Sequence, residues 1–250
     1  MNRNIIQSRP FQIRSHCENV EISPMSSIQE LISGSRLLHD NYVYRQYIQP
    51  QKSSLLYLPY YFSSQNILFT AKSNYKVIGT IGVLTGQLPV FSNFADLIDI
   101  GTDTAVELGS LSISKSYKNR SLFYDLYVHA ILHAIFKVKA DHIFIQVEAR
   151  KASFYQKLLF TQVGKNRVLK QYNNIESVLM HLDLRQTWQF LKHTHESKSY
   201  QNFSNIIAIL KDFEVYDRYK SFKKSLLNRN TFDWTEEDRQ KYNHLCNIMT

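Results

Sequence analysis

Residues Val106 to Gly164 read VELGSLSISKSYKNRSLFYDLYVHAILHAIFKVKADHIFIQVEARKASFYQKLLFTQVG. An alternating stretch at 105–114 predicts a strand, and a basic turn follows it. A long apolar helix should begin at Ser121, and a second apolar strand and a short helix at Ala152–Phe160 should come after it. This order of strand, basic turn, helix, strand and helix is a scaffold that suits a phosphate-bearing ligand.

The residues before this stretch predict a helix and an antiparallel hairpin. Ser27 and Glu30 have the spacing of a capping box, so a helix should begin there. The two β-rich runs Ile67–Ala71 and Lys76–Leu84 are separated by a turn signal. Phe11–Arg14 is expected to form a short first strand.

The residues after this stretch predict one more strand and then helices. Ser177–Leu184 alternates and should form the last strand. Three helices are expected at Ile206–Leu210, at 214–228 and from Thr235. We therefore expect an α+β fold, with a mixed sheet in residues 1–185 and a helical appendage in residues 186–250.

Composition narrows the possible partners. The 250 residues carry a net charge of +9, of which +2 falls in residues 186–250 and the remaining +7 in residues 1–185. This balance favours an acidic partner, but the lack of a run of five basic residues argues against nucleic acid. No apolar stretch is long enough to span a bilayer, and the N-terminus lacks the core of a signal peptide. With only Cys17 and Cys246, a reducing cytoplasm is expected.

The basic turn before the long helix is a candidate anion site. Lys115, Lys118 and Arg120 precede Ser121, where free amides and the helix dipole favour negative charge. A solvated basic turn without a ligand is the alternative.

Two residues of the central stretch are candidates for proton transfer. Glu107 lies in an apolar neighbourhood, and burial would raise its pKa toward the range of a general base. Gly109, two residues later, is typical of a bulge or a close backbone approach. Tyr155 falls off the apolar face of its helix and is a candidate general acid. An exposed Glu and an ordinary amphipathic Tyr are the alternatives.

Histidine pairs give only weak signals of metal binding. His129 and His133 are four residues apart, but Ala130 stands where HExxH has Glu, and no third ligand is in view. His193 and His195 are similarly isolated. We expect no metal and no permanently bound cofactor.

The central stretch resembles the core of the GNAT N-acyltransferases. The matching segments are Glu107, Leu111–Ile113, the turn before Ser121, and Phe154–Phe160 (FYQKLLF). The segments Arg36–Tyr47, Val77–Thr80 and Gln146–Tyr155 are similar to the branch that contains the N-acyl amino acid synthases and acyl-homoserine-lactone synthases. The resemblance covers about residues 10–185 and is closer to the N-acyl amino acid synthases.

The resemblance implies a GNAT fold and roles for individual residues. Glu107 would be the general base and Tyr155 the general acid. The strand residues Leu111, Ser112 and Ile113 would hold the pantetheine arm, and Lys118, Arg120 and Ser121 its phosphate. The co-substrates would be an acyl thioester and an amine such as an amino acid. Arg36 is a candidate clamp for the acceptor carboxylate or, equally, part of a structural salt bridge.

Departures from the family pattern bear on the donor. Ser121 replaces a common Gly and Phe123 replaces a small residue, which leaves less room for a coenzyme A pyrophosphate than for carrier-borne pantetheine. We therefore expect acyl carrier protein as donor and partner, with acyl-CoA as the other possibility. An acyl-homoserine-lactone synthase, a short-chain N-acetyltransferase and an inactive GNAT-like binding protein remain alternatives. An acyl tunnel could be lined by Tyr57, Tyr60, Tyr61 and Phe62.

Overall fold

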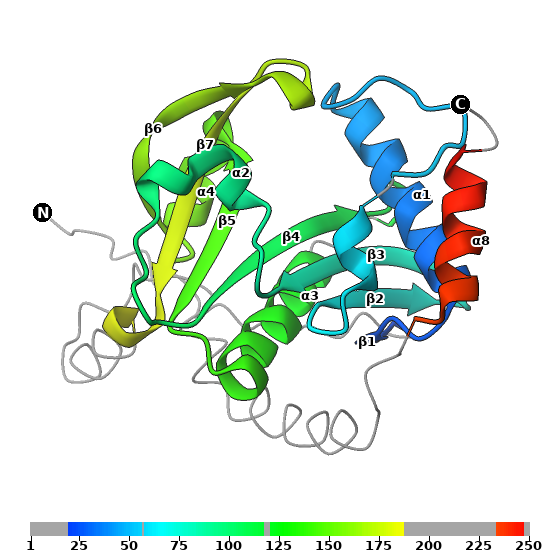
Figure 1. The fold of residues 1–250 in the computed structure, drawn as a ribbon, viewed down its shortest axis with the longest axis horizontal. Coiled ribbons are helices and arrows are strands. Elements are labelled where there is room, and N and C mark those ends of the chain that lie inside the picture. Colours follow the sequence, from blue (N-terminus) through cyan, green and yellow to red (C-terminus); the bar gives the residue numbers. More distant parts are fainter. Residues whose placement is uncertain (1–19, 57, 118–120, 188–233, 248–250) are drawn as a thin grey trace, which may run out of the picture.

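The computed structural model describes residues 20–56, 58–117, 121–187 and 234–247 (Figure 1). Within these ranges, seven strands form one sheet in the order β1-β2-β3-β4-β5-β7-β6. The strands are β1 (Glu21–Pro24), β2 (Ile67–Ser73), β3 (Lys76–Leu84), β4 (Ala105–Ile113), β5 (His142–Glu148), β6 (Thr161–Leu169) and β7 (Ile175–Asp183). The helices are α1 (Ile28–Tyr44), α2 (Val90–Phe94), α3 (Ser121–His133), α4 (Ala152–Gln156) and α8 (Glu236–Asn247). Short 3-10 turns are η1 (Pro59–Phe62), η2 (Ala95–Leu97), η4 (Ala149–Lys151) and η5 (Lys170–Tyr172), and α3 continues as the π-helical η3 (Ala134–Val138).

The sheet is mixed, as the sequence predicts. Strands β1 to β4 are antiparallel, β4 and β5 are parallel, and β5, β7 and β6 are antiparallel again. The parallel pair is joined by α3, which makes β4-α3-β5 the βαβ unit of the domain. The predicted α+β architecture is therefore confirmed.

Helices α1 and α3 cover opposite faces of the sheet. A side chain on Gly79 would meet Leu122 and Leu126 of α3, whereas Thr80 lies 3.2 Å from the position of a Cβ on Gly34 of α1. Consecutive strand residues point to opposite faces, so the two helices sandwich β3. Helix α1 begins as predicted, because the Ser27 hydroxyl accepts a hydrogen bond from the Glu30 amide at 3.2 Å.

Two strands differ from the sequence prediction. The prediction passes from Gly164 directly to the last strand and misses β6, which forms the edge of the sheet and pairs only with β7. Strand β6 is mostly exposed, and its ladder is interrupted between Val163 and Arg167, where Gly164 has a φ of +68°. Such a polar, interrupted edge strand lacks the apolar alternation that identifies a strand. The first strand is β1, and the predicted Phe11–Arg14 lies outside the described residues.

Helix α8 packs beside α1 (Figure 1). It begins after Thr235, as predicted, and its Tyr242 is fully buried in the cluster that α1 forms with the segment at Leu55–Phe62. The Tyr242 hydroxyl lies 2.5 Å from the Ser35 hydroxyl and donates to the Leu56 carbonyl at 2.9 Å. The other two predicted C-terminal helices lie outside the described residues, and the domain boundary at 185 stays a prediction. Among the described helices, none is long and apolar enough to cross a membrane.

Candidate active site

Strands β4 and β5 pair over three residues and then separate. The parallel register joins Ala105 to His142, Val106 to Ile143 and Glu107 to Phe144. Beyond Glu107, β4 continues along β3 and β5 continues along β7. In the ladder that the structure describes, the edge of β4 that faces β5 therefore has no strand partner from Leu108 onward. Strand edges of this kind present backbone donors and acceptors to a ligand.

Glu107 occupies the point where the two strands part. Its side chain is buried, and one carboxylate oxygen accepts a hydrogen bond from the Val90 amide, at the start of α2, at 2.8 Å. Burial raises the pKa of Glu107 to about 7, and the hydrogen bond from Val90 opposes this rise. Among the described residues, Glu107 takes part in no ion pair. It is thus a buried carboxylate that changes charge near neutral pH.

A bulge in β4 shapes the strand beside Glu107. The register with β3 shifts here, and Ser110 has a φ of +55°. Three hydroxyl groups hold this conformation: Thr80 donates to the Ser110 carbonyl at 2.8 Å, Tyr61 donates to the Ser110 hydroxyl at 2.7 Å, and the Tyr60 hydroxyl lies 3.3 Å from it. Gly109 indicates a bulge or a close backbone approach, and the structure shows a bulge beside it, at Ser110. Bulges of this kind change the direction of a strand next to a site.

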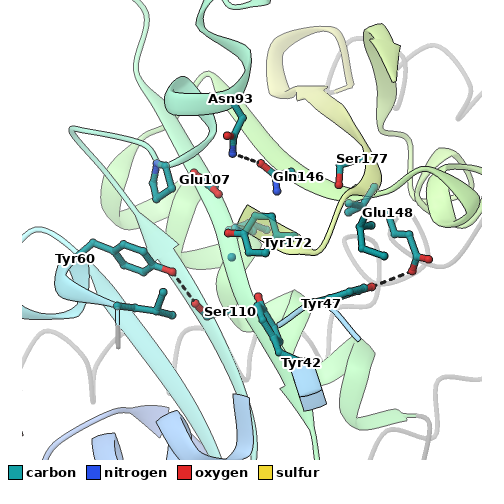
Figure 2. A pocket seen from close by; sticks show the side chains of 16 residues that line it. Tyr42, Tyr47, Tyr60, Asn93, Glu107, Ser110, Gln146, Glu148, Tyr172 and Ser177 are labelled. Atoms are coloured by element: carbon teal, nitrogen blue, oxygen red, sulfur yellow. Dashed lines mark hydrogen bonds between the residues drawn. The ribbon is translucent and has the colours of Figure 1, made fainter. Parts of the chain in front are cut away.

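A pocket of about 140 Å³ opens over Glu107 (Figure 2). Its walls come from α1, η1, α2, β4, β5, η5 and β7. The lining residues are Tyr42, Tyr47, Leu58, Tyr60, Pro89, Asn93, Glu107, Leu108, Gly109, Ser110, Gln146, Val147, Glu148, Tyr172, Ile175 and Ser177. A Cβ on Gly109 would lie 3.8 Å from a Glu107 carboxylate oxygen, so the glycine leaves the space beside the carboxylate open. The pocket therefore gives a small ligand access to Glu107.

Four tyrosines surround this space. The ring of Tyr42 packs edge-on against Tyr47 and Tyr172, with centroids 5.5 and 6.5 Å away. Burial raises the pKa of Tyr42, Tyr60 and Tyr172, and the charge of Glu107 raises each of them further. These phenols are consequently neutral when Glu107 is charged.

A second carboxylate lies at the far end of the pocket and is fully paired. Glu148 accepts a hydrogen bond from Tyr47 at 2.9 Å, forms an ion pair with Lys151 at 3.2 Å, and pairs with Arg150. Burial alone would raise the pKa of Glu148, but these partners lower it below its ordinary value. Glu148 is therefore an anion whose charge is balanced by protein groups, in contrast to Glu107.

The comparison with protein families decides the identity of the domain. Residues 33–183 match the family model of the N-acyl amino acid synthase FeeM. The matched segment covers more than half of the chain. The chain belongs to the FeeM family of N-acyl amino acid synthases. The protein is accordingly an N-acyltransferase, an enzyme that transfers an acyl group to an amine.

Solved structures show the same fold in proteins of low sequence identity. The FeeM N-acyl amino acid synthase from uncultured soil microbes is 16% identical, with a TM-score of 0.59 over 67% of this chain and 92% of that chain. BjaI, a CoA-dependent acyl-homoserine lactone synthase, is 16% identical, with a TM-score of 0.53 over 72% and 91%. The acyl-homoserine lactone synthase LasI is 15% identical, with a TM-score of 0.50 over 66% and 89%. No curated protein matches the sequence.

The residues predicted to hold the thioester lie along β4 and at the start of α3. Leu111 and Ile113 are half-buried on β4. The buried Ser112 accepts a hydrogen bond from Asn41 of α1, and Asn41 also donates to the Ile113 carbonyl at 3.0 Å. Ser121 begins α3, but Lys118 and Arg120 lie outside the described residues. Their roles in binding a donor stay predictions.

Two predicted residues of this FeeM-family enzyme lie away from the pocket. Tyr155 is buried in the core under α3, where it hydrogen-bonds with Tyr127. Arg36 is exposed on α1, because Ser35 and Leu38 occupy the face of the helix that packs inward. Neither side chain lines the pocket. The geometry thus gives no support to Arg36 as a clamp for the acceptor.

The other predicted site features fall in several places. His129 and His133 both lie beside the Phe69 ring, and the described residues contain no cluster of three potential metal ligands. His193 and His195 lie outside the described residues. In the loop that was predicted to line an acyl tunnel, Tyr60 lines the pocket, and Tyr61 and Phe62 are buried in the core. Tyr57 lies outside the described residues.

Sequence reasoning missed most of the pocket wall. Tyr47, Asn93, Gln146, Glu148 and Tyr172 come from elements far apart in the chain. Each is an ordinary polar or aromatic residue in its local context, so no local pattern marks it. The aromatic loop that the sequence analysis named contributes Tyr60 to the wall.

The buried charge of Glu107 predicts a pH-dependent stability. The folded-state pKa of about 7 exceeds the ordinary value of 4.5, so the folded protein loses stability as pH rises between these values. The Glu107→Gln variant lacks this loss. Chemical denaturation should show that the difference in unfolding free energy between the variant and wild type is constant up to about pH 4.5. Above pH 7, this difference should have shifted in favour of the variant by up to about 3 kcal/mol.

Glu176→Gln is the control, because it makes the same substitution at a glutamate that is exposed on β7 and outside the pocket. A Glu107→Gln stability difference that stays constant from pH 4 to pH 8 would contradict the raised pKa.

Proposed function

We propose that the enzyme transfers an acyl chain from an acyl thioester to the amino group of an amino acid or a similar amine, with Glu107 as general base. One observation carries this proposal: a buried carboxylate with a pKa of about 7 lies where β4 and β5 part, at the floor of a pocket. A general base works best when its pKa lies near the working pH. Glu107 has that property and is open to a ligand on the side of Gly109.

The reaction begins with the removal of one proton. An amine is protonated at neutral pH, so its nitrogen has no free electron pair until a base takes the proton. Glu107 accepts that proton, directly or through a water molecule. The nitrogen then forms a bond to the thioester carbonyl carbon. As the tetrahedral intermediate breaks down, the carbon–sulfur bond breaks, the nitrogen gives up a second proton, and the departing thiolate takes up a proton to leave as the free thiol.

The donor is proposed to lie along the open edge of β4. The strand residues Leu111, Ser112 and Ile113 would bind the pantetheine arm, and Lys118, Arg120 and Ser121 would bind its phosphate. Backbone amides near this edge would stabilise the oxyanion of the tetrahedral intermediate. The contacts of Asn41 with Ser112 and Ile113 support this assignment, because they fix the position of this part of the strand.

Replacement of the base should abolish most of the activity. Glu107→Gln keeps the size of the side chain and can still accept the Val90 hydrogen bond, so we expect a loss of kcat of about 10²-fold or more. Wild-type kcat/KM should rise with pH through about 7, since only the charged carboxylate accepts a proton. Steady-state release of free thiol measures both effects. Unchanged turnover in Glu107→Gln would remove Glu107 from this role.

Tyr155 is proposed to protonate the departing thiolate. Its side chain does not line the acceptor pocket, so this role requires the thioester sulfur to lie outside that pocket, beside α4. Burial raises the pKa of Tyr155, so its hydroxyl carries a proton at neutral pH. A general acid matters most for a poor leaving group. Tyr155→Phe should therefore slow transfer from an alkyl thioester by about 10²-fold and transfer from an aryl thioester far less. Equal slowing of both donors would count against this role.

Acyl carrier protein is the proposed donor. The ring of Phe123 stacks on Tyr127 at 4.8 Å and packs edge-on against Phe154 at 5.2 Å, so it fills the space between α3 and α4 near the start of α3. This bulk disfavours the pyrophosphate and nucleotide of coenzyme A more than a single phosphodiester. The net charge of +9 favours encounter with an acidic carrier.

A direct comparison of donors tests this choice. With one acyl chain, kcat/KM should be on the order of tenfold higher for the carrier thioester than for the coenzyme A thioester. Phe123→Ala should reduce this ratio by improving use of the coenzyme A donor, whereas Phe136→Ala at the opposite end of the helix should not. Equal or better use of acyl-CoA by the wild type would refute the proposal.

A further inference from the structure

The pocket wall carries two hydrogen-bond donors that the proposed proton transfer does not use. We propose that the Gln146 amide and the Ser177 hydroxyl bind the carboxylate of an amino-acid acceptor, and that Gln146 thereby selects amino acids over amines without a carboxylate. This inference rests on the proposed acyl transfer at Glu107. It assigns a binding site to the acceptor carboxylate, whereas the predicted clamp Arg36 lies outside the pocket lining.

The orientation of the Gln146 amide is set by a chain of side-chain amides. Gln171 donates to the side-chain oxygen of Asn93 at 2.5 Å, and Asn93 donates to the side-chain oxygen of Gln146 at 2.7 Å. Arg167 donates to the backbone carbonyl of Asn93 at 2.7 Å and so fixes its position. Because the Gln146 oxygen is occupied, its NH2 group points away from Asn93 and into the pocket (Figure 2). Within the described residues, this nitrogen donates no hydrogen bond.

Ser177 supplies a second donor on the same face of the sheet. Gln146 pairs with Leu179 in the ladder of β5 and β7, and Ser177 pairs with Glu148. Gln146 and Ser177 are therefore diagonal neighbours, which lie about 7–8 Å apart and within reach of a long side chain. Ser177 is buried and lines the pocket, and its hydroxyl has no hydrogen-bond partner in the described part of the chain. The two donors can thus contact the two oxygens of one carboxylate.

The spacing between Glu107 and Gln146 suits one α-amino acid. Glu107 pairs with Phe144 in the parallel ladder, and Gln146 follows Phe144 by two residues on the same face of β5. Two residues along a strand cover about 7 Å. In an α-amino acid, one carbon atom separates the amino nitrogen from the carboxylate carbon. An acceptor whose nitrogen contacts Glu107 can therefore reach Gln146 with its carboxylate.

The charges beside Ser177 favour an anion. Glu148 pairs with both Arg150 and Lys151, so this cluster holds two positive charges and one negative charge. Lys151 also donates to the hydroxyl of the pocket residue Tyr47 at 2.8 Å, which holds its ammonium group near the wall. The cluster adjoins Ser177, the ladder partner of Glu148. Its surplus positive charge attracts a carboxylate that binds at the neighbouring donors.

Acceptor selectivity tests the inference. The standard amino acid that the wild-type enzyme acylates fastest is compared with the amine that lacks its carboxylate, in competition for one acyl thioester. The amino acid should be favoured by about tenfold or more in kcat/KM, because hydrogen bonds to a charged group are strong. Gln146→Leu removes the donor and keeps most of the side-chain volume, so this preference should fall by about tenfold, chiefly through a higher KM for the amino acid. Mass spectrometry of the two amide products measures the ratio.

Two further variants complete the test at this position. Gln240→Leu is the matched control and should keep the wild-type preference, because Gln240 is exposed on α8 and does not line the pocket. Gln146→Glu keeps the size of the side chain and replaces the donor with a negative charge. It should lower the preference at least as much as Gln146→Leu, and it replaces that variant if Leu at this position prevents folding.

The orienting role of Asn93 can be tested separately. Asn93→Leu frees the Gln146 amide to rotate, so the preference for the amino acid should fall. In the Gln146→Leu background the same substitution should have little further effect, because Asn93 acts through Gln146. Losses that simply multiply in the double variant would overturn this role.

The outcomes separate this inference from the proposed function. An unchanged preference in folded Gln146 variants, or a wild-type enzyme that acylates the amine as well as the amino acid, overturns the carboxylate site. If Glu107→Gln still slows transfer in that case, the proposed function stands. Absence of amide product from every acceptor, with Glu107→Gln indistinguishable from wild type, overturns both.

Discussion

The hydrogen bond from the Val90 amide to the Glu107 carboxylate is the interaction on which the rest of the site depends. Within the described part of the chain, no cation pairs with this carboxylate. It lies where the backbone ladder between β4 and β5 ends. In the proposed reaction, the parting of the two strands would leave a strand edge for the donor and a pocket for the acceptor. A carboxylate at that point would meet both substrates, and its burial raises its pKa to about 7.

Contacts from β3, η1 and α1 hold this arrangement in place, and α8 packs against α1. The bulge at Ser110 is held by hydroxyl groups from β3 and η1, so the direction of β4 beyond Glu107 is fixed. Asn41 joins α1 to Ser112 and Ile113 of β4. Helix α8 in turn packs on α1 through Tyr242, which is fully buried. The far end of the chain thereby contributes to the rigidity of the site, as a preorganised site requires.

The sequence predicted the features that depend on local pattern. The hairpin, the β4-α3-β5 unit and the buried Glu107 follow from apolar periodicity and from a carboxylate within an apolar run. The pocket wall depends on tertiary contacts: Tyr42, Tyr47 and Tyr172 meet only because α1 and η5 lie across the opening from β4. Strand β6 was missed because both its faces are largely polar. The phase of α1 turns Arg36 outward, so its predicted role as a clamp for the acceptor stays a prediction.

The central claim is that Glu107 is an uncompensated carboxylate that accepts a proton near neutral pH. Carbon-13 NMR of the side-chain carboxyl groups, in protein labelled at glutamate, measures this directly. The account predicts one resonance with a midpoint near pH 7 that is absent from Glu107→Gln and that shifts to lower pH when a cationic amine binds. Titration of every glutamate resonance below about pH 5, near the ordinary value for this side chain, would contradict it.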